Sequence, residues 1–263
     1  MDDRYILQIR NLSIYFGGLA AVNGVNLNVP YGKTVGLIGP NGSGKTTFFN
    51  LVSGIYKPSE GEIWFKNENL TGQKSHQITR RGMARTFQNN RLFWQLSILD
   101  NVILGMYTKQ QAGLVDVLFR YKRVKKELAE CASRAMKILR YFSPELTEQH
   151  QRLVSDLSQG DRRRVEICRA LASDPDLLLL DEPSAGMSPE ETDKLMEDIG
   201  KVRERFRDLS IILIEHDMTV IQNIAEHVFV FNYGKKIAEG PYADIAVNEE
   251  VLEAYLGKET DDA

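Results

Sequence analysis

A glycine-rich stretch that ends in a lysine and a threonine carries the clearest chemistry in this sequence. Residues 39–46, GPNGSGKT, match the pattern G-x-x-x-x-G-K-[ST], with an apolar run before them and helix-forming residues after them. The glycines allow backbone N–H groups to turn inward around phosphate oxygens, and the N-terminus of the following helix favours the same anion. Lys45 can reach the β- and γ-phosphates, and the Thr46 hydroxyl can bind Mg²⁺. The pattern therefore predicts a nucleoside triphosphate site made of Gly39, Pro40, Asn41, Gly42, Ser43, Gly44, Lys45, Thr46 and Thr47.

A second motif places two acidic residues directly after an apolar run. In LLLLDE, residues 177–182, Asp181 would stand at the carboxyl end of a strand beside the phosphate loop, where it can hold Mg²⁺ directly or through water. Glu182 would point toward the γ-phosphate and could orient or deprotonate an attacking water. The alternative is that Glu182 is a solvated loop residue. With a phosphate loop in the same chain, ATP hydrolysis is favoured over transfer to a small acceptor.

A five-residue turn, LSQGD at 157–161, precedes three consecutive arginines. By residue type the turn predicts a helix N-terminus, with Ser158 as the N-cap and Asp161 in the first turn, where the helix dipole favours an acid. Gly160 is unexpected inside a helix start. The residues alone leave open whether this turn binds a ligand.

These motifs require a sheet that holds them at one edge. The early runs YILQIRNLSIYF, GVNLNV and GEIWFK alternate between apolar and polar residues, which predicts an antiparallel, half-exposed sheet. The runs VGLIG, LLLLD and IILIEH are continuously apolar and are bounded by helix-like segments, which is typical of buried parallel strands. We therefore expect an α/β core with an antiparallel β layer beside it.

The middle of the chain has a helical sequence pattern and no strand-like pattern. No segment between about Ile98 and Leu153 resembles a strand, and residues 123–142 have apolar side chains at spacings of three and four. This periodicity predicts an amphipathic helix whose apolar face is formed by Val124, Leu128, Cys131, Ala135, Leu139 and Phe142. We expect one domain, in which 1–97 and 154–240 form the α/β core, 98–153 a helical subdomain and 241–263 a helical tail.

Composition limits the class of protein. The 263 residues are 43% hydrophobic and 26% charged, as in a globular domain, and the net charge of −3 gives no bias toward nucleic acid. Cys131 and Cys168 have no metal-ligand spacing, and a disulfide between them is not expected. The first ten residues, MDDRYILQIR, lack the apolar region of a secretory signal, and no apolar run is long enough to span a bilayer.

The order of the motifs resembles the nucleotide-binding subunit of ATP-binding cassette (ABC) transporters. The phosphate loop is followed by Gln88 in RTFQNN, then by LSQGD, LLLLDEP, SAGMS and ILIEHDM, so the resemblance covers essentially the whole chain. It implies the ABC ATPase fold: an α/β P-loop NTPase core with a mixed or parallel sheet, an N-terminal antiparallel β layer and an inserted helical subdomain. It also implies ATP hydrolysis coupled to transmembrane transport, with ATP and Mg²⁺ bound.

The resemblance assigns roles to further positions. The aromatic platform for adenine falls on Phe16, with Tyr15 as the competing choice. Gln88 matches the glutamine that touches Mg²⁺ and the attacking water, and His216 matches the switch histidine that contacts the γ-phosphate. The implied catalytic group is Glu182, His216, Gln88 and Lys45, and the implied metal group is Thr46, Gln88 and Asp181. Three other histidines are expected to be structural: His76, His150 and His227.

LSQGD takes the place of the family's signature, in which Ser158, Gln159 and Gly160 would bind the γ-phosphate of ATP held by the opposite subunit. Relative to the usual LSGGQ, Gln159 replaces the first glycine and Asp161 the final glutamine. We expect Arg162 and Arg163 to offset the Asp161 charge. Ser188 replaces the usual aspartate in the loop that crosses the dimer interface.

Within the family, FGGLAAVNGVNL, ARTFQNNRLF, IEHDM and VLEAYLG are most similar to the larger ATPase subunit of branched-chain amino acid importers. The alternatives are the ATPases of lipopolysaccharide exporters and of urea or amide importers. From other classes, the alternatives are a soluble ABC ATPase of DNA repair or translation and a P-loop kinase for a small molecule. Near-neutral charge and a single cassette argue against the nucleic-acid function.

The resemblance also implies partners. Two ATPase subunits, identical or different, would form a sandwich with two ATP molecules between them. Integral membrane permease subunits would hold them at the cytoplasmic face of the cell membrane, a substrate-binding protein would act indirectly, and no nucleic acid would bind.

Overall fold

The computed structural model describes residues 2–88, 91–107 and 121–256. The chain divides into two compact units. The first comprises 1–83, 177–182 and 208–263, and the second comprises 84–176 and 183–207. The second unit is larger than the helical subdomain expected at 98–153, because the helix that begins within LSQGD and the helix that follows SAGMS both belong to it.

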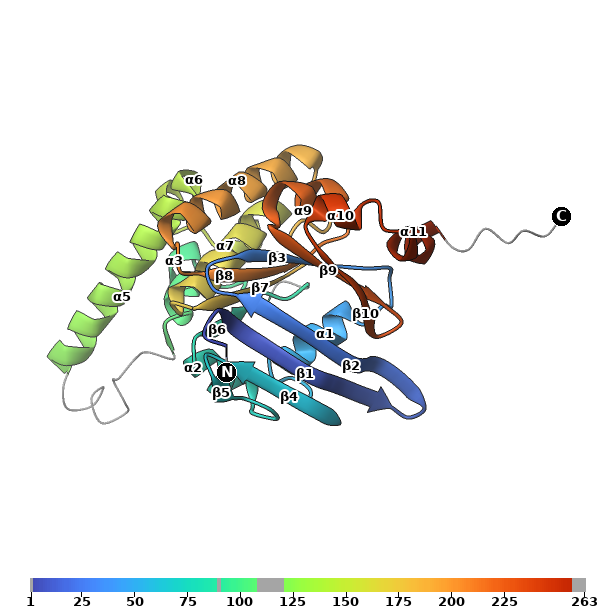
Figure 1. Ribbon diagram of the computed structural model, residues 1–263. Coiled ribbons are helices and arrows are strands. Elements are labelled where there is room, and N and C mark those ends of the chain that lie inside the picture. The colour runs from blue at the N-terminus through green and yellow to red at the C-terminus, as the bar shows by residue number, and fades with distance from the viewer. Residues whose placement is uncertain (1, 89–90, 108–120, 257–263) are drawn as a thin grey trace. The chain divides into compact units, whose positions relative to one another are not determined.

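The first unit contains an antiparallel sheet built from the early alternating runs. Its strands are β1 (Tyr5–Phe16), β2 (Leu19–Pro30), β4 (Glu60–Phe65) and β5 (Glu68–Asn69), in the order β2-β1-β4-β5 (Figure 1). β1 pairs antiparallel with both β2 and β4, and polar and apolar residues alternate along β2. This confirms the antiparallel layer that the alternation predicts.

The same unit contains a mainly parallel sheet. Its strands are β3 (Thr34–Ile38), β7 (Leu177–Asp181), β8 (Ser210–Ile214), β9 (His227–Asn232) and β10 (Lys235–Gly240), in the order β10-β9-β3-β8-β7. β3 pairs parallel with β8 and β9, β7 pairs parallel with β8, and β10 is antiparallel to β9. Every residue of β3, β7 and β8 is buried, as their continuously apolar sequences predict.

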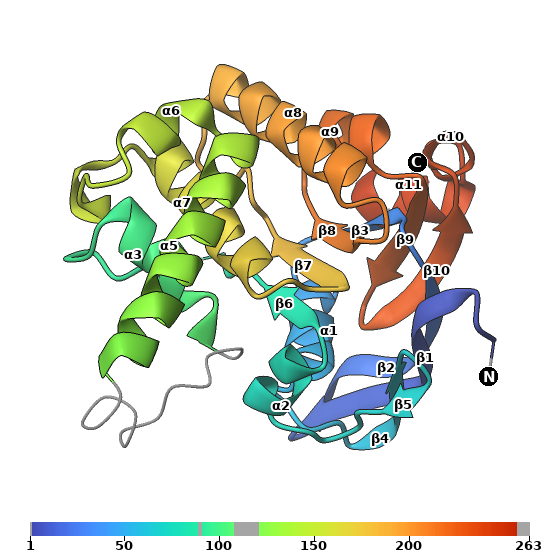
Figure 2. The same ribbon diagram turned by 90° about the vertical axis from the view of Figure 1, so that its left-hand side faces the viewer.

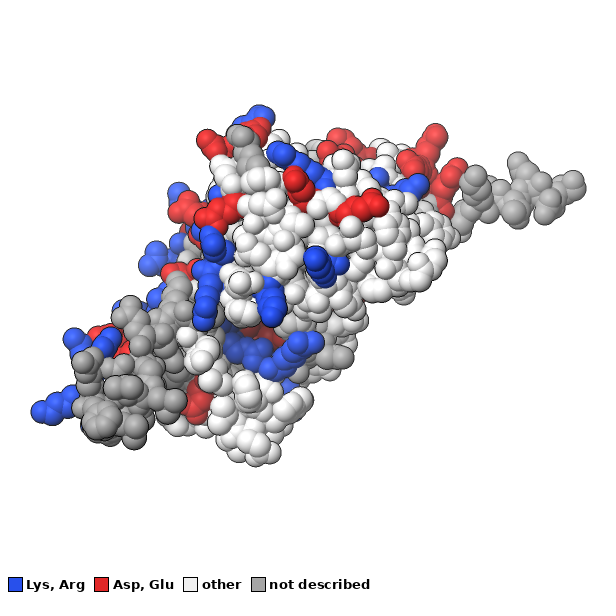
Figure 3. Space-filling model, turned by 90° about the horizontal axis from the view of Figure 1, so that it is seen from below, with Lys and Arg blue, Asp and Glu red and all other residues white. Residues whose placement is uncertain are grey.

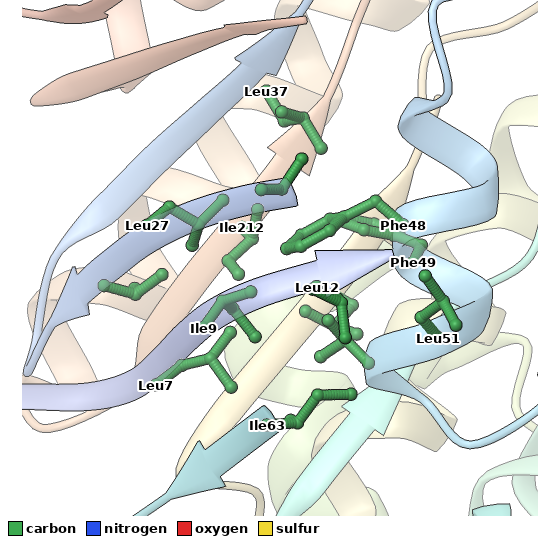
Figure 4. Packing of buried hydrophobic residues seen from close by; sticks show 14 of the residues in the cluster. Leu7, Ile9, Leu12, Leu27, Leu37, Phe48, Phe49, Leu51, Ile63 and Ile212 are labelled. Atoms are coloured by element: carbon green, nitrogen blue, oxygen red, sulfur yellow. The ribbon is translucent and has the colours of Figure 1, made fainter. Parts of the chain in front are cut away.

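A hydrophobic core joins the two sheets to helix α1 (Lys45–Val52), which carries Phe48 and Phe49 into it. Leu7, Ile9 and Leu12 of β1 point toward Phe48, Phe49 and Ile212 (Figure 4). Burial of each such side chain contributes about 1.5–3 kcal/mol. This packing fixes α1, and with it the loop that precedes α1.

Short elements complete the first unit. They are α2 (Ser75–Arg80), α9 (Met218–Ile224), α10 (Tyr242–Ile245) and α11 (Glu249–Leu256). Strand β6 (Met83–Arg85) begins at the last residue of the unit's first segment.

The second unit is helical. It contains α3 (Ile98–Leu104), α5 (Tyr121–Phe142), α6 (Pro144–Glu148), a 3₁₀ turn (Val154–Asp156), α7 (Gln159–Ala172) and α8 (Pro189–Arg205) (Figure 2). Serine side chains cap four of these helices, because each hydroxyl accepts a backbone N–H of the first turn: Ser97 for α3, Ser143 for α6, Ser158 for α7 and Ser188 for α8.

Helix α5 confirms the predicted amphipathic helix, but its apolar face is shorter than predicted. Ala135, Leu139 and Phe142 are buried, whereas Leu128 is 51% exposed. The buried residues all lie in the C-terminal half of α5, and the described part of the N-terminal half is mostly exposed. Periodicity gives the face of a helix but not how far along the helix a neighbour extends.

Three further expectations concern the whole chain. Cys131 and Cys168 are both free thiols, as expected. Within the described ranges, no helix combines the length and the apolar character needed to cross a bilayer. Both signs of charge are spread over the face shown in Figure 3, with uncharged surface between them.

The packing of α3 on α7 leads to a stability prediction for the second unit. A Cβ placed on Gly105, which ends α3, would lie 2.0 Å from the backbone oxygen of Arg169 in α7. Backbone atoms cannot yield as a flexible side chain does, so Gly105→Ala should destabilise the protein by about 1–3 kcal/mol. Urea unfolding followed by far-UV circular dichroism measures this change.

Gly200 in α8 provides the matched control, because a Cβ placed there meets no atom within 4 Å. Gly200→Ala should leave stability unchanged or raise it by about 0.5–1 kcal/mol through helix propensity. Equal effects of the two substitutions would contradict the close approach of α3 and α7.

Candidate functional site

The predicted phosphate loop lies between β3 and α1 in the first unit. Gly39, Gly42 and Gly44 all have positive φ, at 147°, 79° and 103°. A Cβ on Gly39 would lie 2.1 Å from the backbone oxygen of Phe231, and one on Gly44 would lie 2.4 Å from that of Ala21. Around Gly42, by contrast, the space is open. The loop is therefore pressed against the unit's backbone at two glycines and leaves its middle accessible.

Lys45 is buried within this loop. Its side-chain amine donates to the carbonyl oxygens of Gly39, at 2.7 Å, and Pro40, at 3.0 Å. An ammonium has three donors, so one remains for a phosphate oxygen. Burial lowers the pKa of Lys45, while the negative charges of Glu182 and Asp181 raise it. A bound polyphosphate would stabilise the ammonium form further.

The second acidic motif lies at the carboxyl end of β7. Asp181 is the last residue of the strand and is only 1% exposed, and it pairs in register with Ile214 of β8. Glu182 follows with a φ of 47°, a left-handed conformation that costs a residue with a side chain about 1–3 kcal/mol. Its backbone N–H donates to the Ile214 carbonyl at 3.0 Å. The turn is thus held in an unfavourable conformation at the position predicted for the general base.

His216 reaches this glutamate from the end of β8. Its Nε2 lies 2.7 Å from Oε1 of Glu182, and the side chains are 44% and 12% exposed respectively. This contact holds the Glu182 carboxylate in one orientation at the end of the strand. Because β3, β8 and β7 are adjacent, their carboxyl ends bring together the phosphate loop, Asp181, Glu182 and His216.

Glu215 is a further buried acid at the end of β8, and it was not predicted as a site residue. It is 3% exposed, and its carboxylate accepts the backbone N–H of His216 at 3.3 Å. The signal was present in the sequence, because IILIEH, like LLLLDE, is an apolar strand that ends in an acid.

The donors of this site fit Mg²⁺. Asp181 offers a carboxylate and Thr46 a hydroxyl, which are the hard oxygen ligands that Mg²⁺ prefers. Within the described residues no cluster of three or more His, Cys, Asp or Glu forms a metal cage. Mg²⁺ bound by one or two protein oxygens takes its other ligands from phosphates and water, and this donor set suits that mode.

The candidate adenine platform is not decided by exposure. Phe16 is 46% and Tyr15 43% exposed at the end of β1. Phe16 makes an edge contact with Tyr56, with ring centroids 5.4 Å apart, whereas no ring contact of Tyr15 is found among the described residues. Tyr56 is thus a second accessible aromatic beside Phe16, and the sequence pattern did not indicate it.

Gln88 belongs to the second unit, where α7 holds its backbone. Arg163 donates to the carbonyl oxygens of Phe87, at 2.6 Å, and Gln88, at 2.9 Å. Arg163 also forms an ion pair with Glu166 at 2.8 Å, in which both side chains are almost fully buried. Glu166 in turn accepts the Phe87 N–H at 3.1 Å. Burial raises the pKa of Glu166, and the charge of Arg163 opposes that shift.

The signature turn forms the predicted helix start. Ser158 caps α7 by accepting the N–H of Asp161 at 3.1 Å. Gln159 donates its side-chain amide to the carbonyl of Ala185 at 2.9 Å, so this departure from the family pattern joins the turn to the loop before α8. Ser188 in that loop forms a capping box with Glu191 and also donates to Glu190.

The expectation that Arg162 and Arg163 offset Asp161 is wrong. Arg164 lies 3.5 Å from the Asp161 carboxylate, whereas Arg162 donates to the carbonyl oxygens of Val154 and Ser155. Residues three apart face each other on a helix, and residues one or two apart do not. Asp161 therefore shares Arg164 with Asp198, whose carboxylate lies 3.1 Å from that arginine.

Comparison with known families gives two matches. The model described as ABC transporter matches residues 22–185, and the model described as branched-chain amino acid ATP-binding cassette transporter matches residues 235–261. The first match spans more than half of the chain.

Two curated relatives are similar over nearly their whole length. The high-affinity branched-chain amino acid transport ATP-binding protein BraF of Pseudomonas aeruginosa is 39% identical, over 97% of this chain and 99% of the relative. The corresponding protein LivG of Escherichia coli K12 is also 39% identical, over 96% of this chain and 98% of the relative.

Solved structures agree with the sequence comparison. A nucleotide-free ATP-binding cassette from an ABC transporter superposes with a TM-score of 0.83 at 30% identity, over 97% of this chain and 100% of that one. An ATP-binding cassette in its ADP conformation gives a TM-score of 0.83 at 31% identity, with 97% and 99% covered. From its motifs, its fold and these relatives, the chain belongs to the ABC transporter family.

Proposed function

We propose that this chain hydrolyses ATP to power a membrane transporter that imports branched-chain amino acids. The observation that carries the ATPase chemistry is the contact between His216 and Glu182 beside a buried phosphate-loop lysine. The substrate proposal rests on BraF and LivG, whose names give branched-chain amino acid transport, and on the match of residues 235–261.

In the proposed mechanism the loop N–H groups and Lys45 hold the triphosphate. Mg²⁺, when bound through Thr46 and Asp181, supplies charge neutralisation at the phosphates. Glu182 accepts a proton from the attacking water, and His216 holds the Glu182 carboxylate in place and contacts the γ-phosphate. Gln88 senses the membrane subunit and touches the water. Phe16 stacks on the adenine.

The proposed assembly has two ATPase subunits, identical or different, with ATP between them. Ser158, Gln159 and Gly160 of one subunit bind the γ-phosphate held by the other, through the helix N-terminus that Ser158 caps. A dimeric bacterial ABC transporter cassette, 25% identical to this chain, supports such pairing. Integral permease subunits hold the pair at the cytoplasmic face of the membrane, and a substrate-binding protein delivers the amino acid to them.

Substitution of the proposed base tests the chemistry. Glu182→Gln keeps the side-chain size and can still accept a hydrogen bond from His216, but it cannot take a proton from water. ATP turnover should fall by roughly 10²–10⁴-fold, while ATP binding by the purified protein persists. Turnover is measured by phosphate release, and binding by equilibrium dialysis.

Glu204→Gln is the control, because Glu204 is an exposed acid in α8 that lies outside the proposed site. It should hydrolyse ATP at the wild-type rate. Wild-type turnover by Glu182→Gln would refute the assignment of the base.

Uptake by cells tests the substrate. Cells that lack this chain should lose uptake of radiolabelled leucine, isoleucine and valine but retain uptake of lysine. The wild-type chain supplied in trans should restore uptake, and Glu182→Gln should not. If leucine uptake is unaffected by loss of the chain, the substrate proposal fails while the ATPase proposal stands.

A further inference from the structure

The second unit contains a groove that none of the nucleotide-site residues enters. It has a volume of about 480 Å³ and lies between the C-terminal half of α5, the end of α7 and the end of α8. Figure 2 shows these three helices grouped in the second unit. Small-molecule sites typically have volumes of roughly 300–1,000 Å³ and combine an apolar lining with a few polar groups. The size of the groove therefore suits a small ligand.

The interior of the groove is apolar. Ile138 of α5 and Leu171 of α7 are buried at its floor. Tyr141 of α5 and Phe206, which follows α8, form an edge-to-face pair with centroids 6.5 Å apart. Yet these two rings are 40% and 37% exposed. Two aromatic rings left accessible around an apolar floor offer contact area to an alkyl chain.

The rim of the groove is basic. Four cations line it: Arg134, Lys137, Arg140 and Arg205. Its one acid, Asp174, is matched by Arg134 at 3.1 Å. Lys137, Arg140 and Arg205 form no ion pair with any residue that the structure describes. The lining thus carries an excess of positive charge around an apolar floor, although the chain as a whole has a net charge of −3.

We propose that this groove binds a small amphiphilic anion, such as a medium-chain carboxylate. Its alkyl chain lies along Ile138 and against the exposed sides of the Tyr141 and Phe206 rings, and its carboxylate faces Lys137 and Arg140. The groove is concave and half-open, whereas a bilayer presents its headgroups on an extended surface, so we take the ligand to be a free molecule in solution. The site is independent of the nucleotide chemistry proposed above.

Titration of the full chain with octanoate, followed by isothermal calorimetry, tests this inference. Octanoate should bind, and octylammonium and 1-octanol should bind more weakly, because the first is repelled by the rim and the second gains nothing from it. The double variant Lys137→Glu/Arg140→Glu should weaken octanoate binding roughly tenfold, since each reversal replaces an attraction at an exposed site with a repulsion. Tyr141→Ala should weaken octanoate and 1-octanol alike.

Lys125→Glu is the matched control. Lys125 is an exposed lysine of the same helix that does not line the groove, so the charge reversal there should leave octanoate affinity unchanged. ATP turnover of all these variants should equal that of the wild type, and circular dichroism should show that they are folded.

Several results would overturn the proposal. The first is that octanoate does not bind at millimolar concentration, and the second is that octanoate and 1-octanol bind with equal affinity. The third is that Lys125→Glu loses as much octanoate affinity as the double variant. The fourth is that the protein binds anionic phospholipid vesicles but does not bind free octanoate. The last result would identify a membrane-binding surface instead of a pocket for a free anion. If the groove binds an acidic peptide but does not bind octanoate, the result would likewise identify a protein partner and not a small anion.

Discussion

The first unit is organised around the buried side-chain ammonium of Lys45, which has one N–H donor left for a phosphate oxygen. Lys45 is 5% exposed and is held by two carbonyl oxygens of its own loop. Burying this charge costs free energy when no anion is bound. The loop nevertheless keeps Lys45 buried, because Gly39 and Gly44 fit against neighbouring backbone where a residue with a Cβ would not. The core around Phe48 and Phe49 fixes α1 behind the loop. The fold thereby keeps a cation ready for phosphate.

In the second unit, the buried ion pair of Arg163 and Glu166 has a similar role, because it fixes the backbone of a site residue. Together they bind the N–H of Phe87 and the carbonyl oxygens of Phe87 and Gln88. Removing one member of such a pair leaves an uncompensated buried charge. The helix that begins at the signature turn is therefore also the helix that fixes the backbone of Gln88. This arrangement supports a coupling between two motifs that are far apart in sequence.

Much of the fold and of the candidate site could be predicted from residue patterns, and the predictions that were wrong or missing have physical causes. The phosphate loop was predictable because this spacing of glycines before a lysine occurs mainly in nucleotide-binding sequences. The parallel strands were predictable because a strand buried on both faces is apolar throughout. The separate roles of Arg162, Arg163 and Arg164 were not predicted, since consecutive arginines differ only in their angle around α7. Only the pairing of Arg164 with Asp161 corresponds to a spacing that the sequence contains, because residues three apart face each other on a helix. The exposure of Leu128 depends on where a neighbour ends, which periodicity does not contain.

In the proposed assembly, a complete ATP site needs the phosphate loop of one subunit and the signature turn of another. A mixture of two inactive variants distinguishes this arrangement from a site within one subunit. Lys45→Ala removes the loop cation, Ser158→Arg blocks the signature turn, and neither protein alone should hydrolyse ATP. When the two are mixed and allowed to exchange subunits, one site of each mixed pair has both intact halves, so a substantial fraction of wild-type turnover should return. Wild-type turnover by Ser158→Arg alone would contradict a site shared between two subunits. A mixture that stays inactive although both variants form dimers with themselves would contradict a site shared between two copies of this chain.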